Sequence, residues 1–257
     1  MRILVCGASG FVGRHLAKAL HEAGHTVVRG VRRPTGKNDI AIDYRADTDK
    51  AAWLPRLAGV DAVVNAIGVL RDSAKQPMEQ LHGQAPCALF SACAEAGVKR
   101  VVHVSALGVE GDLQTAYYRT KRQAEACLFK LPEEVRWLNL RPSLIYGEDG
   151  ASARLFRKLA SLPVHVHPMG GTQAVQPVHI DDIAKAVCQW LGEPAAISQS
   201  VFAVGAETTT LRGMLESYRA QMGFQPAHAF NMPRALIKLT ARIGDSIPAS
   251  PLCSDTL

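Results

Sequence analysis

The sequence predicts an α/β fold built on a doubly wound parallel sheet, with a small C-terminal lobe on the substrate side. Apolar segments of strand length alternate with helical patterns, and a glycine-rich turn joins the first such strand to the first helix. The strands are continuously apolar, as expected where helices cover both faces of a parallel sheet. Repeated strand–helix order with short connections is typical of this architecture.

The first part of the chain carries the regular alternation. Short apolar runs predict strands at 3–6, 26–31, 40–42, 62–66, 100–105 and 136–140. Helical periodicity between them predicts helices at 11–23, 50–57, 78–96 and 117–129. Gly97 directly follows the long third helix and suits its C-terminal cap.

The alternation loosens after Gly147. Helices are expected at 152–160, 181–191 and 211–222, with a strand at 201–204 and a Pro/Gly-punctuated stretch at 162–177. We therefore expect a nucleotide-binding core at 1–150. Residues 151–257 are expected to form a smaller lobe integrated with that core.

Composition narrows the class of protein. The 257 residues suffice for one large domain, or a main domain with a small lobe. The net charge is +6, but the basic residues are dispersed and not interleaved with aromatics, which argues against a nucleic-acid partner. Six cysteines without a CxxC pair favour a reduced cytoplasmic protein over a disulfide framework.

Membrane insertion is not expected. No apolar run approaches the length of a transmembrane helix, and a strand beginning at Arg2 leaves no room for a signal peptide. A basic amphipathic helix expected at 233–243, with Arg234, Lys238 and Arg242 on one face, has two interpretations. It either lies on a membrane or partner surface, or packs normally with a solvated face.

The glycine turn spans residues 7–13, Gly-Ala-Ser-Gly-Phe-Val-Gly. In such a turn Gly7 makes the tight bend, Gly10 lets the backbone approach a pyrophosphate, and Gly13 allows close helix–strand packing. The free amides around Ser9, Phe11 and Val12 would then face the phosphates at the positive end of the helix. A strand before it and a helix after it make this a strong dinucleotide motif.

The end of the second strand indicates which dinucleotide. NAD-binding proteins place an acid there for the ribose hydroxyls, but this chain has Arg32 and Arg33. Two guanidinium groups suit a 2′-phosphate, which favours NADP(H) over NAD(H); the alternative is a solvated loop. Asp43 and Tyr44, just past the third strand, either edge the adenine pocket or, for Asp43, merely end the strand.

Further candidates follow the fourth strand, where Asn65, Ala66, Ile67 and Gly68 leave room for the cofactor's ribose. The alternative there is a plain strand-to-loop transition.

Ser105 ends the fifth strand, and Tyr117 and Lys121 lie one turn apart on the next helix. The lysine would lower the pKa of the phenol and hold the nicotinamide ribose, while the serine would orient a carbonyl or hydroxyl substrate.

The chain resembles the extended or atypical short-chain dehydrogenases/reductases. The resemblance covers about residues 1–190 and rests on GASGFVG, NAIG, Ser105, YYRTK, RPSLIYG and VHIDDIA, in that order. It implies a Rossmann core with Tyr117 and Lys121 as catalytic groups, and Pro142 and Ser143 beside the nicotinamide. The implied function is an NADP(H)-dependent oxidoreductase for a carbonyl, hydroxyl or quinone-like substrate.

Within that superfamily the chain looks similar to the nucleotide-binding accessory subunit of respiratory complex I and to NmrA-like proteins, which suggests an alternative. The chain would then be a non-catalytic NADP(H)-binding module, with a protein complex or membrane surface as partner. Sugar-epimerase or reductase chemistry is a weaker alternative, since His82 stands where many extended members carry asparagine. His165 and His167 alternate on a strand, and without a third ligand they predict no metal site.

Overall fold

The fold is known from a computed structural model that describes residues 1–232, so the expected helix at 233–243 lies outside the described part. Seven strands form one sheet in the order β11-β6-β5-β4-β1-β2-β3, every neighbouring pair being parallel. The strands are β1 (Arg2–Cys6), β2 (Thr26–Val31), β3 (Asp39–Ala41), β4 (Ala62–Asn65), β5 (Arg100–Val104), β6 (Arg136–Pro142) and β11 (Gln199–Ala203). The predicted doubly wound α/β class is confirmed.

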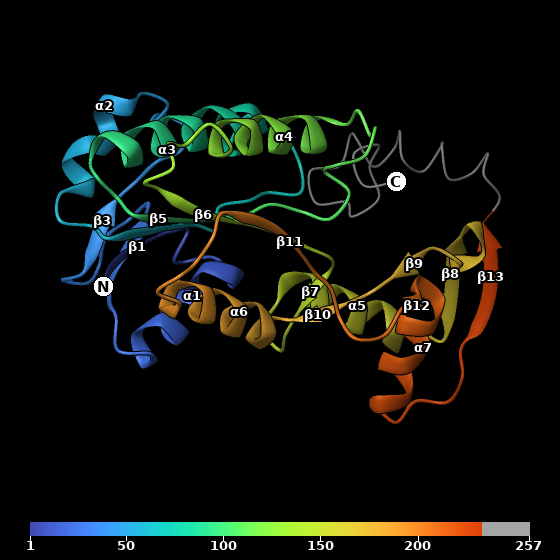
Figure 1. The fold of residues 1–257 in the computed structure, drawn as a ribbon. Coiled ribbons are helices and arrows are strands. Elements are labelled where there is room, and N and C mark those ends of the chain that lie inside the picture. Colours follow the sequence, from blue (N-terminus) through green and yellow to red (C-terminus); the bar gives the residue numbers. More distant parts are fainter. Residues whose placement is uncertain (233–257) are drawn as a thin grey trace. The chain divides into compact units, whose positions relative to one another are not determined.

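Helices cover both faces of this sheet. One face carries α1 (Phe11–Glu22) and α6 (Ile180–Gly192), and the other carries the remaining helices of this part (Figure 1). Those helices are α2 (Lys50–Trp53), η1 (Leu54–Leu57), η2 (Glu79–Gln84), α3 (Ala85–Glu95) and α4 (Ala116–Leu128). Helices on both faces explain why the central strands are apolar on both sides.

The hydrophobic core on the α3 side fixes that layer. Leu4, Val63 and Val101 of adjacent strands pack with Leu89 and Phe90 of α3, and all five are fully buried. Every second residue of a strand points to the same face, so Cys6, Asn65 and His103 at the carboxyl ends point the same way. Three adjacent strands therefore end in a polar or polarisable side chain on this face.

The chain divides into two compact units. The first comprises residues 1–142 and 180–203, and the second comprises 143–179 and the described residues from 204 on. This differs from the expected boundary near residue 150, because α6 and β11 return to the sheet and β11 pairs with β6. Strand 201–204 of the expected lobe is thus an edge strand of the main sheet.

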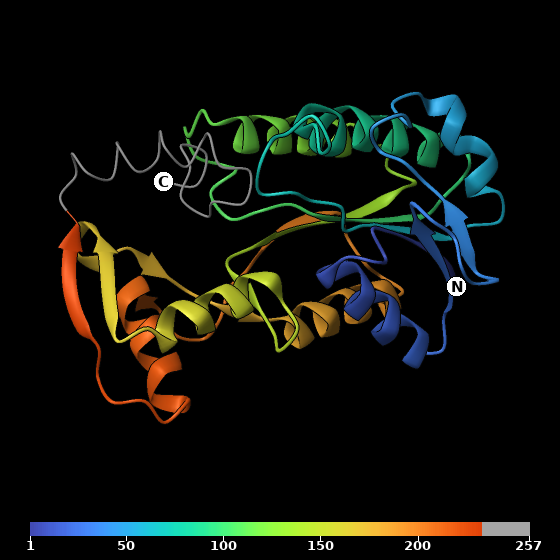
Figure 2. The same cartoon turned by 180° about the vertical axis from the view of Figure 1, so that it is seen from behind.

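The second unit is built from short elements around two helices, α5 (Ala151–Ser161) and α7 (Leu211–Gln221), which pack together (Figure 2). Three strand pairs accompany them, β7–β10, β9–β12 and β8–β13. Their strands and single turn are β7 (Ile145–Tyr146), β8 (Val164–Pro168), η3 (Met169–Gly171), β9 (Ala174–Val175), β10 (Val178–His179), β12 (Thr209–Thr210) and β13 (His228–Met232).

The long helix predicted at 78–96 contains an irregularity. Residues 79–84 form a π-helix, η2, and the regular helix α3 follows. Pro86 lies at the start of α3, where a missing N–H and a bulky ring interrupt regular helical hydrogen bonding. Such π segments are rare and are frequently found at functional sites, and η2 carries His82.

One pair of cysteines is oxidised, which corrects the expectation of reduced thiols. Cys87 of α3 and Cys127 of α4 form a disulfide, with their Cα atoms 5.3 Å apart. They are 40 residues apart in the chain, so only the packing of α3 against α4 brings them together. Among the described residues Cys6, Cys93 and Cys188 are free thiols. No helix within 1–232 is long and apolar enough to cross a membrane.

Candidate functional site

The glycine turn after β1 has a geometry that only glycine permits. Gly7 has φ of 81°, and its N–H donates to Gly30 of β2 over 3.1 Å. A Cβ on Gly13 would lie 2.1 Å from the carbonyl oxygen of Gly7, and a Cβ on Gly7 would lie 2.8 Å from Ile67. The turn, α1 and the end of β4 are therefore in direct contact through their backbones.

The N-terminus of α1 offers the groups that bind a diphosphate. The helix begins after Gly10, whose carbonyl accepts the N–H of Arg14 over 3.0 Å. The first turn contains no acidic residue, and no side chain caps it. The amides of Phe11, Val12 and Gly13 thus lack intrahelical acceptors and lie at the positive end of the helix dipole. These residues fit the pyrophosphate of a dinucleotide cofactor.

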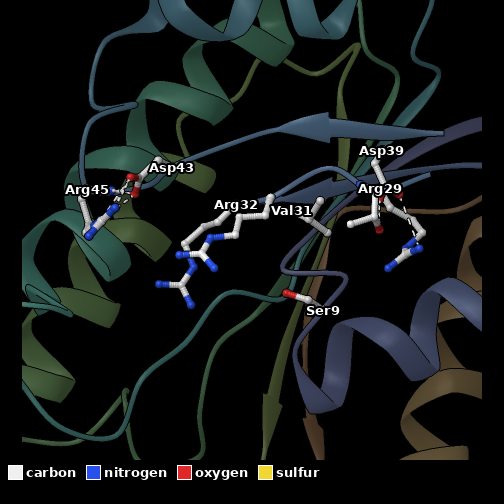
Figure 3. Close-up of a pocket in the computed structure, with 9 residues that line it drawn as sticks. Ser9, Arg29, Val31, Arg32, Asp39, Asp43 and Arg45 are labelled. Atoms are coloured by element: carbon white, nitrogen blue, oxygen red, sulfur yellow. Dashed lines mark hydrogen bonds and ion pairs between the residues drawn. The ribbon is translucent and has the colours of Figure 1, made fainter. Parts of the chain in front are cut away.

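A cavity of about 610 Å³ is lined by residues of β2 and β3, of the segments that follow these strands, and of the glycine turn (Figure 3). Four guanidinium groups and two carboxylates are among the groups that line it, so positive charge predominates. The lining residues are Ser9, Arg29, Val31, Arg32, Arg33, Thr35, Asp39, Asp43 and Arg45. Charged residues from β2, from β3 and from the segments after them thus line one cavity next to Ser9 of the glycine turn.

Both carboxylates of this cavity have partners. Asp43 forms three hydrogen bonds of 2.5–3.1 Å with the guanidinium of Arg45, which lowers the pKa of Asp43. Asp39 accepts backbone N–H bonds from Thr35 and Gly36, which lower its pKa, and lies 3.4 Å from Arg29. Both acids are therefore held ionised by these groups, and Oδ1 of Asp39 accepts no hydrogen bond among the described residues.

Arg32 and Arg33 differ from the other two arginines. Neither forms an ion pair within 4 Å with any residue in the described range, although Arg32 lies close enough to Asp43 to help lower its pKa. Figure 3 shows Arg32 extending into the cavity between the Asp43–Arg45 pair and Ser9. The arginines predicted from sequence therefore line a cavity next to the glycine turn.

Tyr44 does not line this cavity. Its side chain is 2% exposed, its ring packs edge-on against Trp53, and its hydroxyl donates to Asn65 over 3.1 Å. The expected place for Tyr44 at the rim of an adenine pocket is thus corrected. Leu4, Val28 and Ile42 belong to the same cluster and keep the ring in the interior.

Asn65 is buried too, and its side chain serves the sheet instead of a ligand. It is fully buried, accepts from Tyr44, and lies 3.1 Å from His103 Nδ1 on the neighbouring strand. The expected cofactor contact of this side chain is therefore corrected. Ala66 and Ile67 contact Gly7, and a Cβ on Gly68 would lie 3.7 Å from the ammonium of Lys121.

Three polar residues form a stripe along α4 at successive turns: Tyr117, Lys121 and Glu125. Lys121 is 3% exposed and donates to the carbonyl of Val104, at the end of β5, over 2.8 Å. Glu125 accepts two bonds from Arg141 of β6, of 2.6 and 3.0 Å. The stripe fixes α4 to the carboxyl ends of β5 and β6.

Ser105 belongs to this stripe and not to an open site. Its side chain is 4% exposed and donates to Glu125 over 2.6 Å. The hydroxyl expected to orient a substrate thus donates its proton to Glu125. Glu125 was missed at the sequence level, although it stands one helical turn beyond Lys121.

The acidities also differ from the expectation. Burial raises the pKa of Tyr117 to about 12, and neighbouring Tyr118 adds to the rise. Burial lowers the pKa of Lys121 to about 8, against a smaller opposing effect of Glu125. The expected lowering of the phenol's pKa by the lysine is absent, because Lys121 is directed at Val104.

The remaining predicted positions lie at the end of β6. The carbonyl of Pro142 accepts from the N–H of Leu107 over 2.8 Å. The hydroxyl of Ser143 donates to the carbonyl of Gln176, within the second unit. His165 and His167 are buried on β8, and no cluster of three metal-ligating side chains occurs in residues 1–232.

The glycine turn, the helix behind it and the parallel sheet define a dinucleotide-binding α/β protein of the extended short-chain dehydrogenase/reductase type. The profile of the NAD dependent epimerase/dehydratase family matches residues 3–205, so the chain belongs to that family.

Relatives and solved structures agree with this assignment. The chain is 24% identical over 250 residues to the NADH-ubiquinone oxidoreductase 40 kDa subunit of Neurospora crassa, covering 93% of this chain and 64% of the subunit. It is 33% identical to Epimerase family protein Mb2239 of Mycobacterium bovis, covering 75% and 69%.

Among solved structures, MoeE5 with UDP-glucuronic acid and NAD superimposes with a TM-score of 0.75. It is 22% identical, and the match covers 90% of this chain and 85% of that one. This likeness concerns the fold. The resemblance to extended family members and to the complex I subunit is thereby confirmed.

Proposed function

We propose that this chain binds NADP(H) and that holding the cofactor, more than turning it over, is its principal function. The observation that carries the proposal is the Ser105–Glu125 hydrogen bond of 2.6 Å. It removes the hydroxyl that an oxidoreductase of this type would use to orient its substrate.

The loop after β5 contains one other hydroxyl, and it has a structural role. Between Ser105 and Tyr117 the only other hydroxyl-bearing residue is Thr115. Its Oγ1 caps α4 by accepting the N–H of Tyr118. The proton of Ser105 is thus donated to Glu125, and the oxygen of Thr115 is engaged by the amide of Tyr118.

The preference for NADP(H) rests on the charge of the cavity at β2. Arg32 and Arg33 extend from the end of β2, and Asp39 and Asp43 are engaged by other groups. A guanidinium pair binds a phosphate in bidentate fashion, whereas ribose hydroxyls are best held by a free carboxylate. These features support binding of a 2′-phosphate.

The second candidate is catalysis by the same site, which the Tyr117–Lys121 pair favours. Bound NADP(H) would supply hydride chemistry, and Tyr117 would exchange the proton with a carbonyl, hydroxyl or quinone-like substrate. A pKa of about 12 leaves the phenol protonated at neutral pH. Tyr117 is thus suited to donate a proton, and poorly suited to accept one.

A protein partner fits the first candidate. A relative of this chain is a subunit of a mitochondrial NADH-ubiquinone oxidoreductase, and a cofactor held without turnover would stabilise such an assembly or report on it. We propose association with a protein complex, including a peripheral position at a membrane, as the setting for cofactor binding.

The test is a fluorescence titration of the purified chain with NADPH and with NADH, followed by turnover assays with quinones, aldehydes, ketones and nucleotide sugars. We expect tighter binding of NADPH and no oxidation of it by any of these compounds. Oxidation of NADPH that is lost in Tyr117→Phe would establish the second candidate instead. Equal affinity for the two cofactors would contradict the assignment of the arginines.

A further inference from the structure

His82 lies at the centre of the π-helix η2 and is 1% exposed. Its Nε2 accepts the backbone N–H of Val69 over 2.8 Å, and its Nδ1 lies 3.4 Å from the hydroxyl of Thr120 on α4. One side chain therefore joins two segments, the loop that follows β4 and the helix that carries Tyr117 and Lys121.

The direction of these hydrogen bonds fixes the state of the ring. Nε2 accepts an amide proton, so a neutral imidazole must carry its own proton on Nδ1 and donate it to Thr120. The hydroxyl of Thr120 in turn donates a hydrogen bond to the carbonyl of Ala116 over 2.8 Å. A continuous chain of donors thus runs from Val69 to Ala116, and both ring nitrogens are used.

The ring of His82 lies beside Gly68, Lys121 and Tyr117, which are among the predicted site residues. A Cβ on Gly68 would lie 3.8 Å from His82 Nε2 and 3.7 Å from Lys121 Nζ, so both side chains flank the same short segment of backbone. The rings of His82 and Tyr117 meet edge-on with centroids 5.4 Å apart. η2 and α4 also form the most extensive helix–helix contact in the described part of the chain.

We propose that His82 is a positioning residue that ties the Gly68–Val69 backbone to α4 and so sets the place of Lys121 against the bound cofactor. This rests on the proposed binding of NADP(H). His82 contacts neither cofactor nor substrate in this assignment, and it acts through Val69 and Thr120.

The alternative of a proton shuttle does not suit this environment. Burial, with the nearby charge of Lys121, lowers the pKa of His82 to about 2. The ring thus stays neutral throughout the working range of a protein, and a proton added to Nε2 would break the bond to Val69. A fixed acceptor is the role that this geometry permits.

Three substitutions separate the two bonds. In His82→Gln the amide oxygen lies near the place of Nε2 and can still accept from Val69. The shorter side chain of His82→Asn reaches only toward Thr120, and His82→Leu keeps the bulk without either bond. Gln84→Ala is the control, because Gln84 is exposed on the same π-helix.

The first measurement is hydrogen–deuterium exchange of the Val69 amide in the cofactor-free protein. The second is the dissociation constant for NADPH. A partly buried amide that loses its acceptor exchanges faster, and we expect about tenfold faster exchange in the Asn and Leu variants with the Gln variant close to wild type. NADPH affinity should follow the same order, falling about tenfold in Asn and Leu.

The outcomes are separable from those of the proposed function. Wild-type affinity for NADPH in His82→Leu would show that only the bulk of the side chain matters. An affinity for NADPH in His82→Gln as low as that in His82→Leu would show that the hydrogen bond to Val69 has no role. Either result overturns the proposal. If wild type itself fails to bind NADPH, the proposed function fails. The exchange of Val69 then shows by itself whether His82 holds this backbone, and unchanged exchange in Asn and Leu would reject that too.

Discussion

Ser105 and Glu125 share a buried hydrogen bond of 2.6 Å that joins the end of β5 to the third turn of α4. Glu125 simultaneously holds the guanidinium of Arg141 on β6. One carboxylate thus accepts from two neighbouring strands. The carbonyl of Val104, one residue before Ser105, accepts the ammonium of Lys121. Two successive turns of α4 therefore bind two successive residues at the end of β5, and the helix has little freedom to shift along the sheet edge.

Replacing Glu125 tests how much this junction contributes to stability. Glu125→Gln keeps the shape of the side chain and leaves Arg141, whose side chain is 14% exposed, with the more distant carboxylate of Glu110, 3.8 Å away. Breaking one side of a buried pair costs about 3–5 kcal/mol in the free energy of unfolding. Urea denaturation should show a loss of that order. Ser105→Ala removes one hydrogen bond and should cost about 1 kcal/mol.

The same pair predicts a pH dependence. Burial alone would raise the pKa of Glu125, but hydrogen bonds from Arg141 and Ser105 outweigh it and lower the pKa below its ordinary value. The stabilisation is therefore complete above the unfolded-state pKa of about 4.3 and is lost as pH falls through the folded-state value. Glu125→Gln should show a flatter stability profile below about pH 4. An identical acid slope in both proteins would disprove the linkage.

Gly13→Ala tests the contact between α1 and the glycine turn. The added Cβ would lie 2.1 Å from the carbonyl oxygen of Gly7, so the helix must shift away from β1. We expect destabilisation of about 1–3 kcal/mol together with loss of NADPH binding, measured by thermal unfolding and by titration. Gly192→Ala is the matched control, because a Cβ there meets no atom within 4 Å. Retention of binding in Gly13→Ala would mean that the turn is not the phosphate site.

Arg32→Ala and Arg33→Ala test the source of cofactor preference. Each guanidinium that binds the 2′-phosphate contributes about 1.5–3 kcal/mol, or about 10- to 150-fold in the dissociation constant for NADPH. NADH affinity should change little, because NADH lacks that phosphate. Lys37→Ala controls for general loss of positive charge, since Lys37 is exposed and does not line the cavity. Equal weakening of both cofactors would assign the arginines to another part of the ligand.

The parts of the molecule that follow local rules were predictable from the sequence. The glycine turn is constrained by backbone sterics, so the spacing of Gly7, Gly10 and Gly13 was enough to locate it. Apolar runs located the strands of the sheet, because helices bury both faces of those strands. Arg32 and Arg33 were found because the end of the second strand has a fixed place beside the turn in this architecture.

The parts that depend on pairing across the fold were not predictable. The spacing of Ser105 and Tyr117 does not indicate that Glu125 accepts a hydrogen bond from the serine. That bond depends on how α4 packs on β5. Tyr44 follows a strand, as ligand-binding residues of this architecture do. Its hydroxyl instead donates to Asn65 of β4, and the side chain is buried. The Cys87–Cys127 disulfide requires the packing of α3 against α4, which sequence spacing alone does not give.

Reduction of Cys87–Cys127 should destabilise the fold. The bond closes a loop of 40 residues, and cross-links of this span typically stabilise by about 3–4 kcal/mol by restricting the unfolded chain. Denaturation with and without dithiothreitol should show a shift of this order, with thiol alkylation and mass spectrometry reporting the oxidation state. Cys127→Ser should be as unstable as the reduced protein and insensitive to the reductant. A protein that is fully alkylated without reduction would show that the bond does not form.

Lys121→Met tests the buried ammonium through the alkaline range. Burial lowers the pKa of Lys121 to about 8, whereas an unfolded lysine has a pKa of about 10.4. Between these values the unfolded chain binds more protons than the folded one, so stability attributable to Lys121 rises with pH in that window.

Buried thiols such as Cys6, with a pKa raised to about 12 by burial, act in the opposite direction, because they stay protonated after folding. The informative quantity is thus the difference between wild type and Lys121→Met at each pH. We expect that difference to move in favour of wild type by about 2–4 kcal/mol from pH 8 to pH 10.4, measured in urea without cofactor. A constant difference would mean that Lys121 titrates normally and that its ammonium is not held in the desolvated position beside Val104.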